Sequence, residues 1–250
     1  MLRSVKELRG YTIQARDGEI GKVHAFLFDD RAWIVRYLVV NTGNWLAQRL
    51  VLIAPAALRE PDWTEQIFPV DLDSEQVKES PDIDVDKPVS RQQEIDLHRH
   101  YHWSMYWAGE PGIGALGVPP APPVTGTDSP SNDTGETEEG DPNLRSTREI
   151  IGYQIAARDG DIGRVDDFIL EDDGWFLRYT VADTRTGLVG KQFLLAVSWI
   201  ERIDWHEGRA YVDLMRNQIE NSPIYDPAEP VNRQYEERLY DYYGRPCYWE

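Results

Sequence analysis

The strongest constraint on the fold is an internal duplication. The segment ARDGEIGKV at 15–23 returns as ARDGDIGRV at 157–165. At the same offset of 142 residues, the stretch 8–107 aligns with 150–249 without a gap, and about 40 of the 100 aligned pairs are identical. Identity at this level over a fixed offset indicates a tandem duplication. Both copies are therefore expected to form the same structure.

The two copies define the domain organisation. We expect a first domain at 1–107 and a second at 148–250, joined by a linker at 108–147. The linker is rich in Gly, Pro, Thr and acidic residues, so it cannot bury enough apolar surface to offset its ordering entropy. We expect it to be a disordered coil that spans roughly 35 Å. A tether of that reach leaves the packing of the two domains open.

Turn signals and period-two patterns predict a mainly β fold in each copy. Strand-like runs at 11–16 and 20–28 flank an Asp-Gly turn at 17–18, and the same turn recurs at 159–160. Gly21 lies just inside the second run, where a missing side chain indicates a bulge or a close backbone approach. Five or six short strands in about 65 residues predict a small antiparallel barrel, closed or nearly closed, in each copy.

A short helical tail is expected after each barrel. Ser90 and Gln93 have the spacing of a capping box, and Asn232, a favoured N-cap residue, begins the corresponding helix. Each tail ends in Tyr-Trp, at 106–107 and 248–249. We expect these aromatic ends to cover the barrel or the other domain.

The stretch GYTIQARDGEIGKVHAFLFDDRAWIVRYLVVNT, at 10–42, combines the Asp-Gly hairpin, an Ile-Gly pair and a Trp-x-x-Arg-Tyr strand. In these features both copies, at about 8–72 and 150–214, resemble the PRC-barrel family. That family includes the cytoplasmic domain of the photosynthetic reaction centre H subunit and the C-terminal barrel of the ribosome maturation factor RimM. The resemblance implies a β-barrel fold. It is nearest to the stand-alone duplicated form, since no counterpart of the H-subunit membrane helix or of the N-terminal domain of RimM is expected here.

The charge of the chain restricts its partners. There are 26 basic and 44 acidic side chains, giving a formal net charge of −18, and no block of Lys or Arg. Phosphate backbones would be repelled, so direct nucleic-acid binding is not expected. A protein partner, which could be basic, fits this charge. Packing of one barrel on the other, or a homo-oligomer, is also compatible with the sequence.

Compartment signals indicate a cytoplasmic protein. The single cysteine, Cys247, cannot form an intrachain disulfide. We recognise neither a signal-peptide core nor a run of about 18 apolar residues, so membrane insertion is not expected. Peripheral contact with a membrane complex stays open.

The sequence offers one suggestive metal pattern, His98, His100 and His102 at alternate positions. Alternate residues lie about 200° apart on a helix and would not converge on one ion, whereas a strand would place all three on one face. The capping box favours the helix. We therefore expect no metal site, and whether these three residues bind a metal is left to the structure.

Other polar residues have structural interpretations. The paired acids at 29–30 and 172–173 are typical of turns, because adjacent side chains on a strand end point apart. Arg36 and Arg178 lie within apolar strands, where we expect them to face outward or to pair with acids of the neighbouring hairpin. Trp63 and its counterpart are expected to be core or rim aromatics.

Catalytic signatures are missing from the sequence: there is no GxSxG, GxxxxGK, GxGxxG, CxxC or HExxH motif. We therefore expect no enzyme activity, no catalytic residues and no cofactor. The leading hypothesis is a non-catalytic adaptor or scaffold in protein–protein interaction. Two alternatives follow the resemblance, namely a peripheral component of a photosynthetic or other membrane electron-transfer complex, and a RimM-like helper of ribosome maturation or RNA processing.

Overall fold

A computed structural model describes residues 1–83, 88–107, 143–184 and 190–249. The first copy contains, in chain order, β1 (Leu2–Ser4), α1 (Val5–Leu8), β2 (Thr12–Ala15), β3 (Gly18–Asp29), β4 (Ile34–Asn41), the 3-10 turn η1 (Gly43–Leu46), β5 (Leu50–Ile53), the 3-10 turn η2 (Pro55–Ala57), β6 (Ile67–Pro69), α2 (Ser74–Lys78) and α3 (Arg91–Tyr101). The second copy contains β7 (Leu144–Ser146), α4 (Thr147–Ile150), β8 (Gln154–Ala157), β9 (Gly160–Glu171), β10 (Phe176–Asp183), β11 (Gln192–Ala196), the 3-10 turn η3 (Val197–Trp199), β12 (Ile200–Asp204), β13 (Arg209–Val212), α5 (Arg216–Glu220), β14 (Ile224–Tyr225) and α6 (Arg233–Tyr243).

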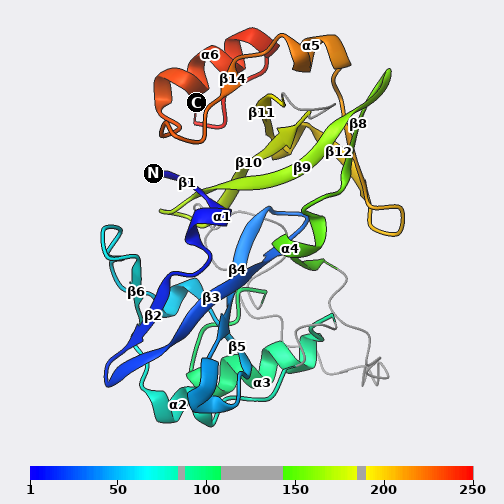
Figure 1. Ribbon diagram of the computed structural model, residues 1–250. Coiled ribbons are helices and arrows are strands. Elements are labelled where there is room, and N and C mark those ends of the chain that lie inside the picture. The colour runs from blue at the N-terminus through cyan, green and yellow to red at the C-terminus, as the bar shows by residue number, and fades with distance from the viewer. Residues whose placement is uncertain (84–87, 108–142, 185–189, 250) are drawn as a thin grey trace, which may run out of the picture.

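The described strands belong to one 14-stranded sheet, whose main path is β12-β13-β8-β9-β10-β4-β3-β2-β6. Off this path, β5 pairs with β4, β11 pairs with β10, and β14 pairs with β11. Figure 1 shows the two copies one above the other, with the tail helices α3 and α6 at opposite ends. Buried apolar side chains of both copies form a single core cluster. The mainly β prediction is confirmed.

The two copies exchange their first strands. β1 of the first copy pairs antiparallel with β9 of the second and places Leu2 opposite Glu171. β7 of the second copy pairs antiparallel with β3 of the first and places Leu144 opposite Asp29. The offset of 142 relates both members of these pairs, since 2 + 142 = 144 and 29 + 142 = 171, so the two exchanges have the same register. Each copy completes the sheet of the other.

β4 and β10 meet at the centre of the molecule, where Ile34 lies opposite its own counterpart, Phe176. The amide of Val35 donates to the carbonyl oxygen of Trp175 at 2.8 Å, and the equivalent bond runs in the opposite direction at the same distance. A local two-fold axis therefore passes between these strands and relates the two exchanges.

The finer prediction, a small antiparallel barrel in each copy that is closed or nearly closed, is not confirmed. The sheet formed by the described strands runs through both copies and is not closed. Its continuity has a physical cause, because β1 and β7 satisfy the backbone groups of the other copy and β4 pairs with β10 across the axis. Two pairings are also parallel, β2 with β6 and β13 with β8.

The predicted hairpins form, with each turn one residue earlier than expected. Ala15 lies opposite Gly18, so the turn between β2 and β3 is at 16–17, and a register shift between Ile13 and Gln14 marks a bulge. The next glycine on β3, Gly21, and its counterpart lie in a tight place. A Cβ atom on Gly21 would lie 2.2 Å from the carbonyl oxygen of Asn41, and one on Gly163 would lie 2.2 Å from that of Asp183. The predicted close backbone approach is confirmed in both copies.

The predicted linker boundary needs correction. Most of the segment at 108–147, namely 108–142, lies outside the described residues. Its last residues do not belong to a linker, because 144–146 form β7 and Thr147 begins α4. Leu144 is 6 % exposed and Thr147 is fully buried, so burial holds this segment against the first copy.

The two tail helices begin where the sequence predicts. The Ser90 hydroxyl accepts a hydrogen bond from the Gln93 amide at 3.2 Å, and the Gln93 side chain accepts one from the Ser90 amide at 2.8 Å. Asn232 caps α6 by accepting a hydrogen bond from the Tyr235 amide at 2.9 Å. Within the described residues, no helix has both the length and the apolar character needed to cross a membrane.

Candidate functional site

A buried glutamate joins the helical tail to the sheet in the first copy. Glu94, in the first turn of α3, is fully buried. Its Oε1 accepts hydrogen bonds from the Tyr37 hydroxyl at 2.9 Å and the Tyr106 hydroxyl at 2.7 Å, and its Oε2 lies 2.8 Å from Nη1 of Arg91. Tyr37 belongs to β4 and Tyr106 to the segment after α3. One carboxylate thus connects strand, helix and aromatic end, which we call the tail cluster.

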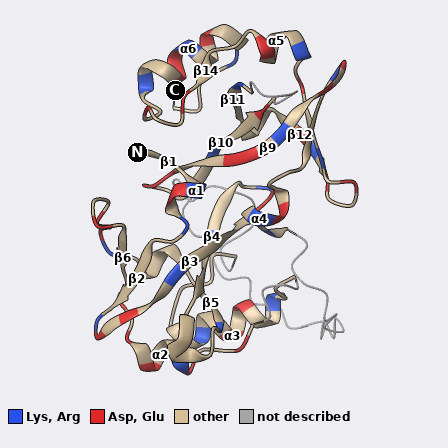
Figure 2. Ribbon diagram, in the orientation of Figure 1, with Lys and Arg blue, Asp and Glu red and all other residues tan. Residues whose placement is uncertain are grey.

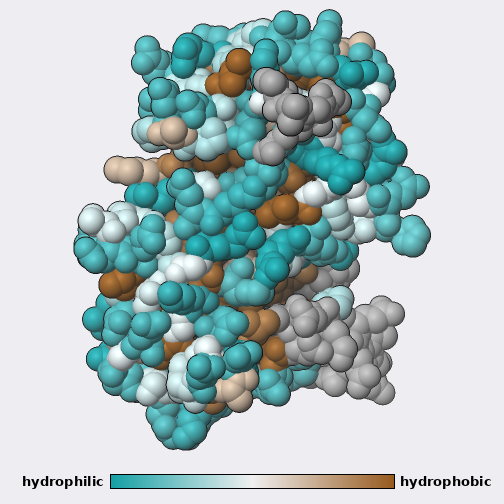
Figure 3. Space-filling view, in the orientation of Figure 1, coloured by the Kyte–Doolittle hydropathy of each residue, from teal (hydrophilic) through white to brown (hydrophobic). Residues whose placement is uncertain are grey.

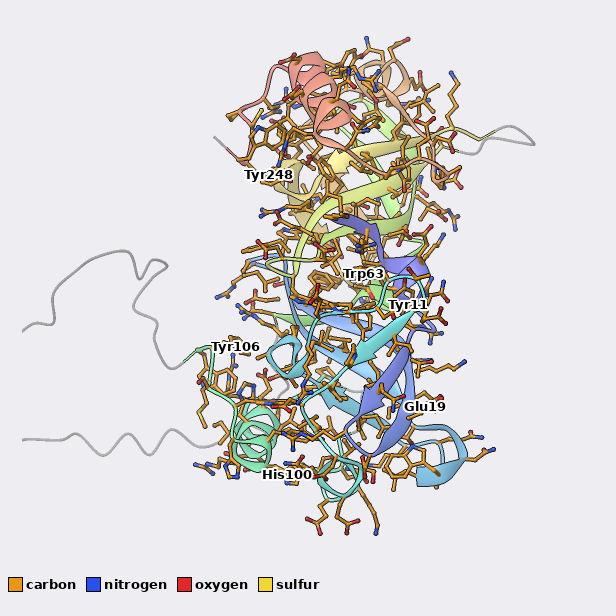
Figure 4. The ribbon with its side chains drawn as sticks, turned by 90° about the vertical axis from the view of Figure 1, so that its left-hand side faces the viewer. Tyr11, Glu19, Trp63, His100, Tyr106 and Tyr248 are labelled. Carbon is orange, nitrogen blue, oxygen red and sulfur yellow. The ribbon has the colours of Figure 1, made fainter. Side chains whose placement is uncertain are left out.

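The second copy repeats the tail cluster. Oε1 of Glu236 accepts hydrogen bonds from the Tyr179 hydroxyl at 2.7 Å and the Tyr248 hydroxyl at 2.8 Å, and its Oε2 lies 3.1 Å from Nη1 of Arg233. Figure 4 labels Tyr106 and Tyr248, which lie in opposite halves of the molecule. The aromatic ends therefore cover their own copies, which is one of the two arrangements expected from the sequence.

The tyrosines of the tail cluster act as hydrogen-bond donors. Burial, followed by the negative charge of Glu94, raises the pKa of Tyr37 and of Tyr106. Burial likewise raises the pKa of Tyr179. Hydroxyls of this kind stay protonated at neutral pH, so they satisfy the buried carboxylate and do not serve as bases. The arrangement is suited to fixing the tail in place.

An arginine covers each tail cluster from the strand side. The Arg36 guanidinium lies 4.0 Å from the ring centroid of Tyr106, and its Nη2 lies 3.2 Å from Asp29 Oδ2. Arg178 lies 4.1 Å from the equivalent tyrosine ring, and its Nε donates to Glu171 Oε2 at 2.8 Å. The predicted ion pairs with acids of the neighbouring hairpin are confirmed.

His98 adds an imidazole to the first tail cluster, where the second copy has a tyrosine. Its Nε2 lies 2.8 Å from the Tyr37 hydroxyl, and its Nδ1 lies 2.9 Å from the Ser104 carbonyl oxygen, which can only accept. Burial lowers the pKa of His98, with the carbonyl partners acting in the opposite direction. The neutral ring therefore accepts at Nε2, in competition with Glu94 for the single Tyr37 proton. Tyr240 stands at the equivalent position of the second copy and carries a hydroxyl proton of its own.

The three histidines of the sequence pattern do not converge. Nε2 of His100 lies 2.7 Å from the Gln76 carbonyl oxygen, whereas His102 ends α3 in a left-handed conformation with φ 59°. Among the residues that the structure describes, no three His, Cys, Asp or Glu side chains are placed to hold a metal ion. The helical spacing accounts for this, because alternate side chains point to opposite faces.

Arg3 joins the two copies at their junction. Its guanidinium lies 3.3 Å from the ring centroid of Trp63, in its own copy, and its Nε donates to Asp172 Oδ2 of the other copy at 2.8 Å. Figure 4 shows Trp63 near the middle of the molecule, where the copies meet. Trp63 is thus a rim aromatic, as expected, and it holds a cation that also bridges the copies.

The reciprocal contact involves Arg145, whose guanidinium lies 4.4 Å from the ring centroid of Trp205 and whose Nε lies 4.0 Å from Asp30 Oδ2. The neighbouring acid, Asp29, accepts two backbone amides of its turn at 3.0 and 3.1 Å. The two adjacent carboxylates therefore have different partners: Asp29 accepts hydrogen bonds within the turn, and Asp30 contacts Arg145 at the junction. They do not form an acid/base pair.

A groove of about 710 Å³ lies between β3, β5 and the segment of β7 and α4. Its floor includes Leu27, Val39 and Leu144, which are 5 %, 2 % and 6 % exposed. At its rim, His24 and Arg148 are in contact. Because the floor is already buried, the groove offers little free apolar surface to a ligand.

Comparison of the sequence with protein-family models and with curated proteins finds no match. The tail clusters and the junction are therefore interpreted from their own chemistry.

Neither the two buried glutamates nor the arginines paired with them were predicted from the sequence. Glu94 and Arg91 are identical to their counterparts Glu236 and Arg233. The available signal was an Arg and a Glu three residues apart on the predicted helix, a spacing that lets them pair, repeated in both copies.

Proposed function

We propose that this chain is a non-catalytic adaptor of the PRC-barrel type, which works in the cytoplasm and binds a protein partner of opposite charge. One observation supports the proposal most directly. The buried and half-buried charges described above, at the tail clusters and the junction, are engaged in holding copies and tails together. Side chains engaged in this way position surfaces for contact, which supports a binding role.

The surface and the net charge favour a basic partner. The face shown in Figure 3 is largely hydrophilic, with smaller hydrophobic patches. The ribbon in Figure 2 shows acidic and basic residues distributed along both copies. With a net charge of −18, the chain attracts basic surfaces over several ångströms, and that attraction weakens as salt screens it.

The test is capture of partners from cell extract by the immobilised full chain, at physiological salt and again at about 0.5 M salt. We expect specific proteins that are retained at the first salt concentration and released at the second. Turnover of a defined substrate by the purified chain, or failure to retain any specific protein, would contradict the proposal.

A matched pair of variants locates the contact on one copy or the other. Glu65 and Glu207 are equivalent, exposed residues in the turn before β6 and in the turn between β12 and β13. Glu65→Lys and Glu207→Lys change the net charge equally. Unequal loss of a captured partner assigns the contact to one copy, whereas equal loss indicates general electrostatic attraction.

A further inference from the structure

We propose that the junction also fits a second copy of this chain, so that two chains can exchange halves. In such a dimer, the first half of each chain, before residue 108, pairs with the second half of the other chain, after residue 142. The surface involved consists of β1 on β9, β7 on β3 and the contact of β4 with β10. This inference goes beyond the adaptor proposal, because it names a partner that needs no other protein.

The contacts between the halves do not depend on which chain supplies each half. β1 lies on β9 with Leu2 opposite Glu171, and β7 lies on β3 with Leu144 opposite Asp29. The connection between the halves runs through 108–142, which is 142 − 108 + 1 = 35 residues. A chain of that length reaches at most about 120 Å. Exchange between chains therefore preserves every contact of the junction.

The second half accepts the first half through acids that the first half lacks. The Ser4 hydroxyl donates to Asp167 at 2.5 Å, the Lys6 amide donates to the same carboxylate at 3.0 Å, and the Lys6 ammonium lies 2.6 Å from Asp166. The first half has Ala25 and His24 at the positions of these two acids. Two first halves would therefore place a hydroxyl and an ammonium against groups that do not satisfy them.

A second contact opposes pairing of two first halves. The Phe26 amide, on β3, donates to the hydroxyl of Thr147 at 3.3 Å. At the position of Thr147 the first half has Val5. If β1 lay on β3, this buried amide would lose its acceptor, and an unmade buried hydrogen bond is costly. The contacts thus select a first half with a second half.

Two second halves could satisfy one another, because Ser146 and Arg148 would meet Asp167 and Asp166. Every such pair, however, leaves two first halves with only each other. Because every chain carries one half of each kind, the unfavourable pairing of two first halves offsets any gain from pairing two second halves. We therefore expect exchanged dimers to contain only complementary halves.

Protein concentration decides how often exchange occurs. Because 35 residues of chain connect them, the two halves of one chain meet at an effective concentration of the order of 1 mM. Dilute chains therefore pair internally, whereas chains folded together at high concentration also pair with a neighbour. An exchanged dimer persists after dilution, because its release requires both strand exchanges to open.

The test uses a disulfide across β1 and β9 in the full chain, with Cys247→Ser to remove the native thiol. Leu2 and Glu171 form a non-hydrogen-bonded pair, because the amide of Asp172 donates to the carbonyl of Met1 in the adjacent pair. In such pairs the Cα atoms lie about 4.5 Å apart, which a disulfide can bridge. L2C/E171C cross-links one chain internally or links two exchanged chains.

Two matched variants detect the other pairings. L2C/D29C forms a disulfide only if two first halves pair, and L144C/E171C forms one only if two second halves pair. L144C/D29C reports the complementary pairing from the other exchange, so it replaces L2C/E171C if that variant fails to fold.

Each variant is refolded at about 1 µM and at about 500 µM, oxidised, and resolved without reductant. We expect L2C/E171C to give internal cross-links at low concentration and additional covalent dimers at high concentration, with no dimers from either control. Internal cross-links alone at high concentration would overturn exchange between chains. Covalent dimers from either control would overturn the selective pairing of complementary halves.

Discussion

The Tyr37 hydroxyl donates a 2.9 Å hydrogen bond to Glu94, 57 residues further along the chain. The second copy repeats this bond between Tyr179 and Glu236, which are also 57 residues apart in sequence. A buried carboxylate is costly unless it is paired and hydrogen-bonded. The strand tyrosine is thus part of what makes it possible to bury the first turn of the tail helix.

Removing this hydroxyl should destabilise each copy. We expect Tyr37→Phe and Tyr179→Phe each to lower the free energy of unfolding by about 1–3 kcal/mol, because a buried carboxylate loses a donor while the ring still packs. Chemical denaturation followed by tryptophan fluorescence measures the change. Tyr242→Phe is the control, because its hydroxyl bonds the Gln218 carbonyl oxygen at an exposed site on α6, where water can replace the lost donor; it should change stability by less than about 1 kcal/mol. Variants as stable as the unchanged chain would contradict the role of the tail cluster.

His98 should make stability sensitive to mild acid. Burial lowers the pKa of His98 below its unfolded value, so the unfolded chain binds this proton first. Stability is fully present above the unfolded pKa, near 6.5, and falls as pH drops below it. His98→Tyr introduces the residue of the second copy and removes this contribution. We expect a shallower decline of unfolding free energy between pH 7.5 and about 5 in the variant. Parallel pH profiles would show that His98 does not titrate differently on folding.

Asp167 should make the free energy of unfolding fall as pH rises, the opposite of the effect of His98. Burial raises the pKa of Asp167, and hydrogen bonds from Ser4 and Lys6 offset this only in part. In the pH window between the unfolded and the raised folded pKa, the folded state binds more protons, so stability declines as pH rises through that window. Asp167→Asn keeps the shape and removes the charge. We expect the variant to lose this decline when unfolding is measured from about pH 4 upward, and an unchanged profile would contradict the assignment.

Gly21 should tolerate no side chain. A Cβ atom there would lie 2.2 Å from a backbone carbonyl oxygen, which cannot move without shifting β4. We expect Gly21→Ala to lower the free energy of unfolding by at least about 2 kcal/mol. Gly10→Ala also places alanine at positive φ, but its Cβ meets no atom within 4 Å. It therefore measures the cost of the backbone conformation without a steric clash. Equal effects of the two substitutions would contradict the steric argument.

Local patterns predicted the local structure well. The Asp-Gly hairpins, the tight glycine at Gly21 and the caps at Ser90 and Asn232 depend on neighbouring residues, and all of them form. The helical prediction for His98 and its neighbours also holds, and with it the separation of the three imidazoles. Signals of this kind act over a few residues, so the sequence displays them directly.

The strand exchange could not be predicted in the same way. β1 and β7 are three residues each, too short to show a period, and their partners lie in the other copy. One signal was present, since Leu-Arg-Ser at 2–4 recurs at 144–146 at the same offset. The second Leu-Arg-Ser was assigned to the end of the predicted linker, so it was not interpreted as a strand. The buried glutamates escaped for a related reason, because their tyrosine donors lie on a distant strand.

The exchanged strands impose an order on biosynthesis. As the ribosome synthesises the chain, β3 is complete by Asp29, yet the segment that covers its edge begins only at Leu144. The first half therefore emerges with one strand edge unsatisfied and waits for more than a hundred residues of further translation. The second half finds β1 already made, so assembly of the molecule finishes from its C-terminal end.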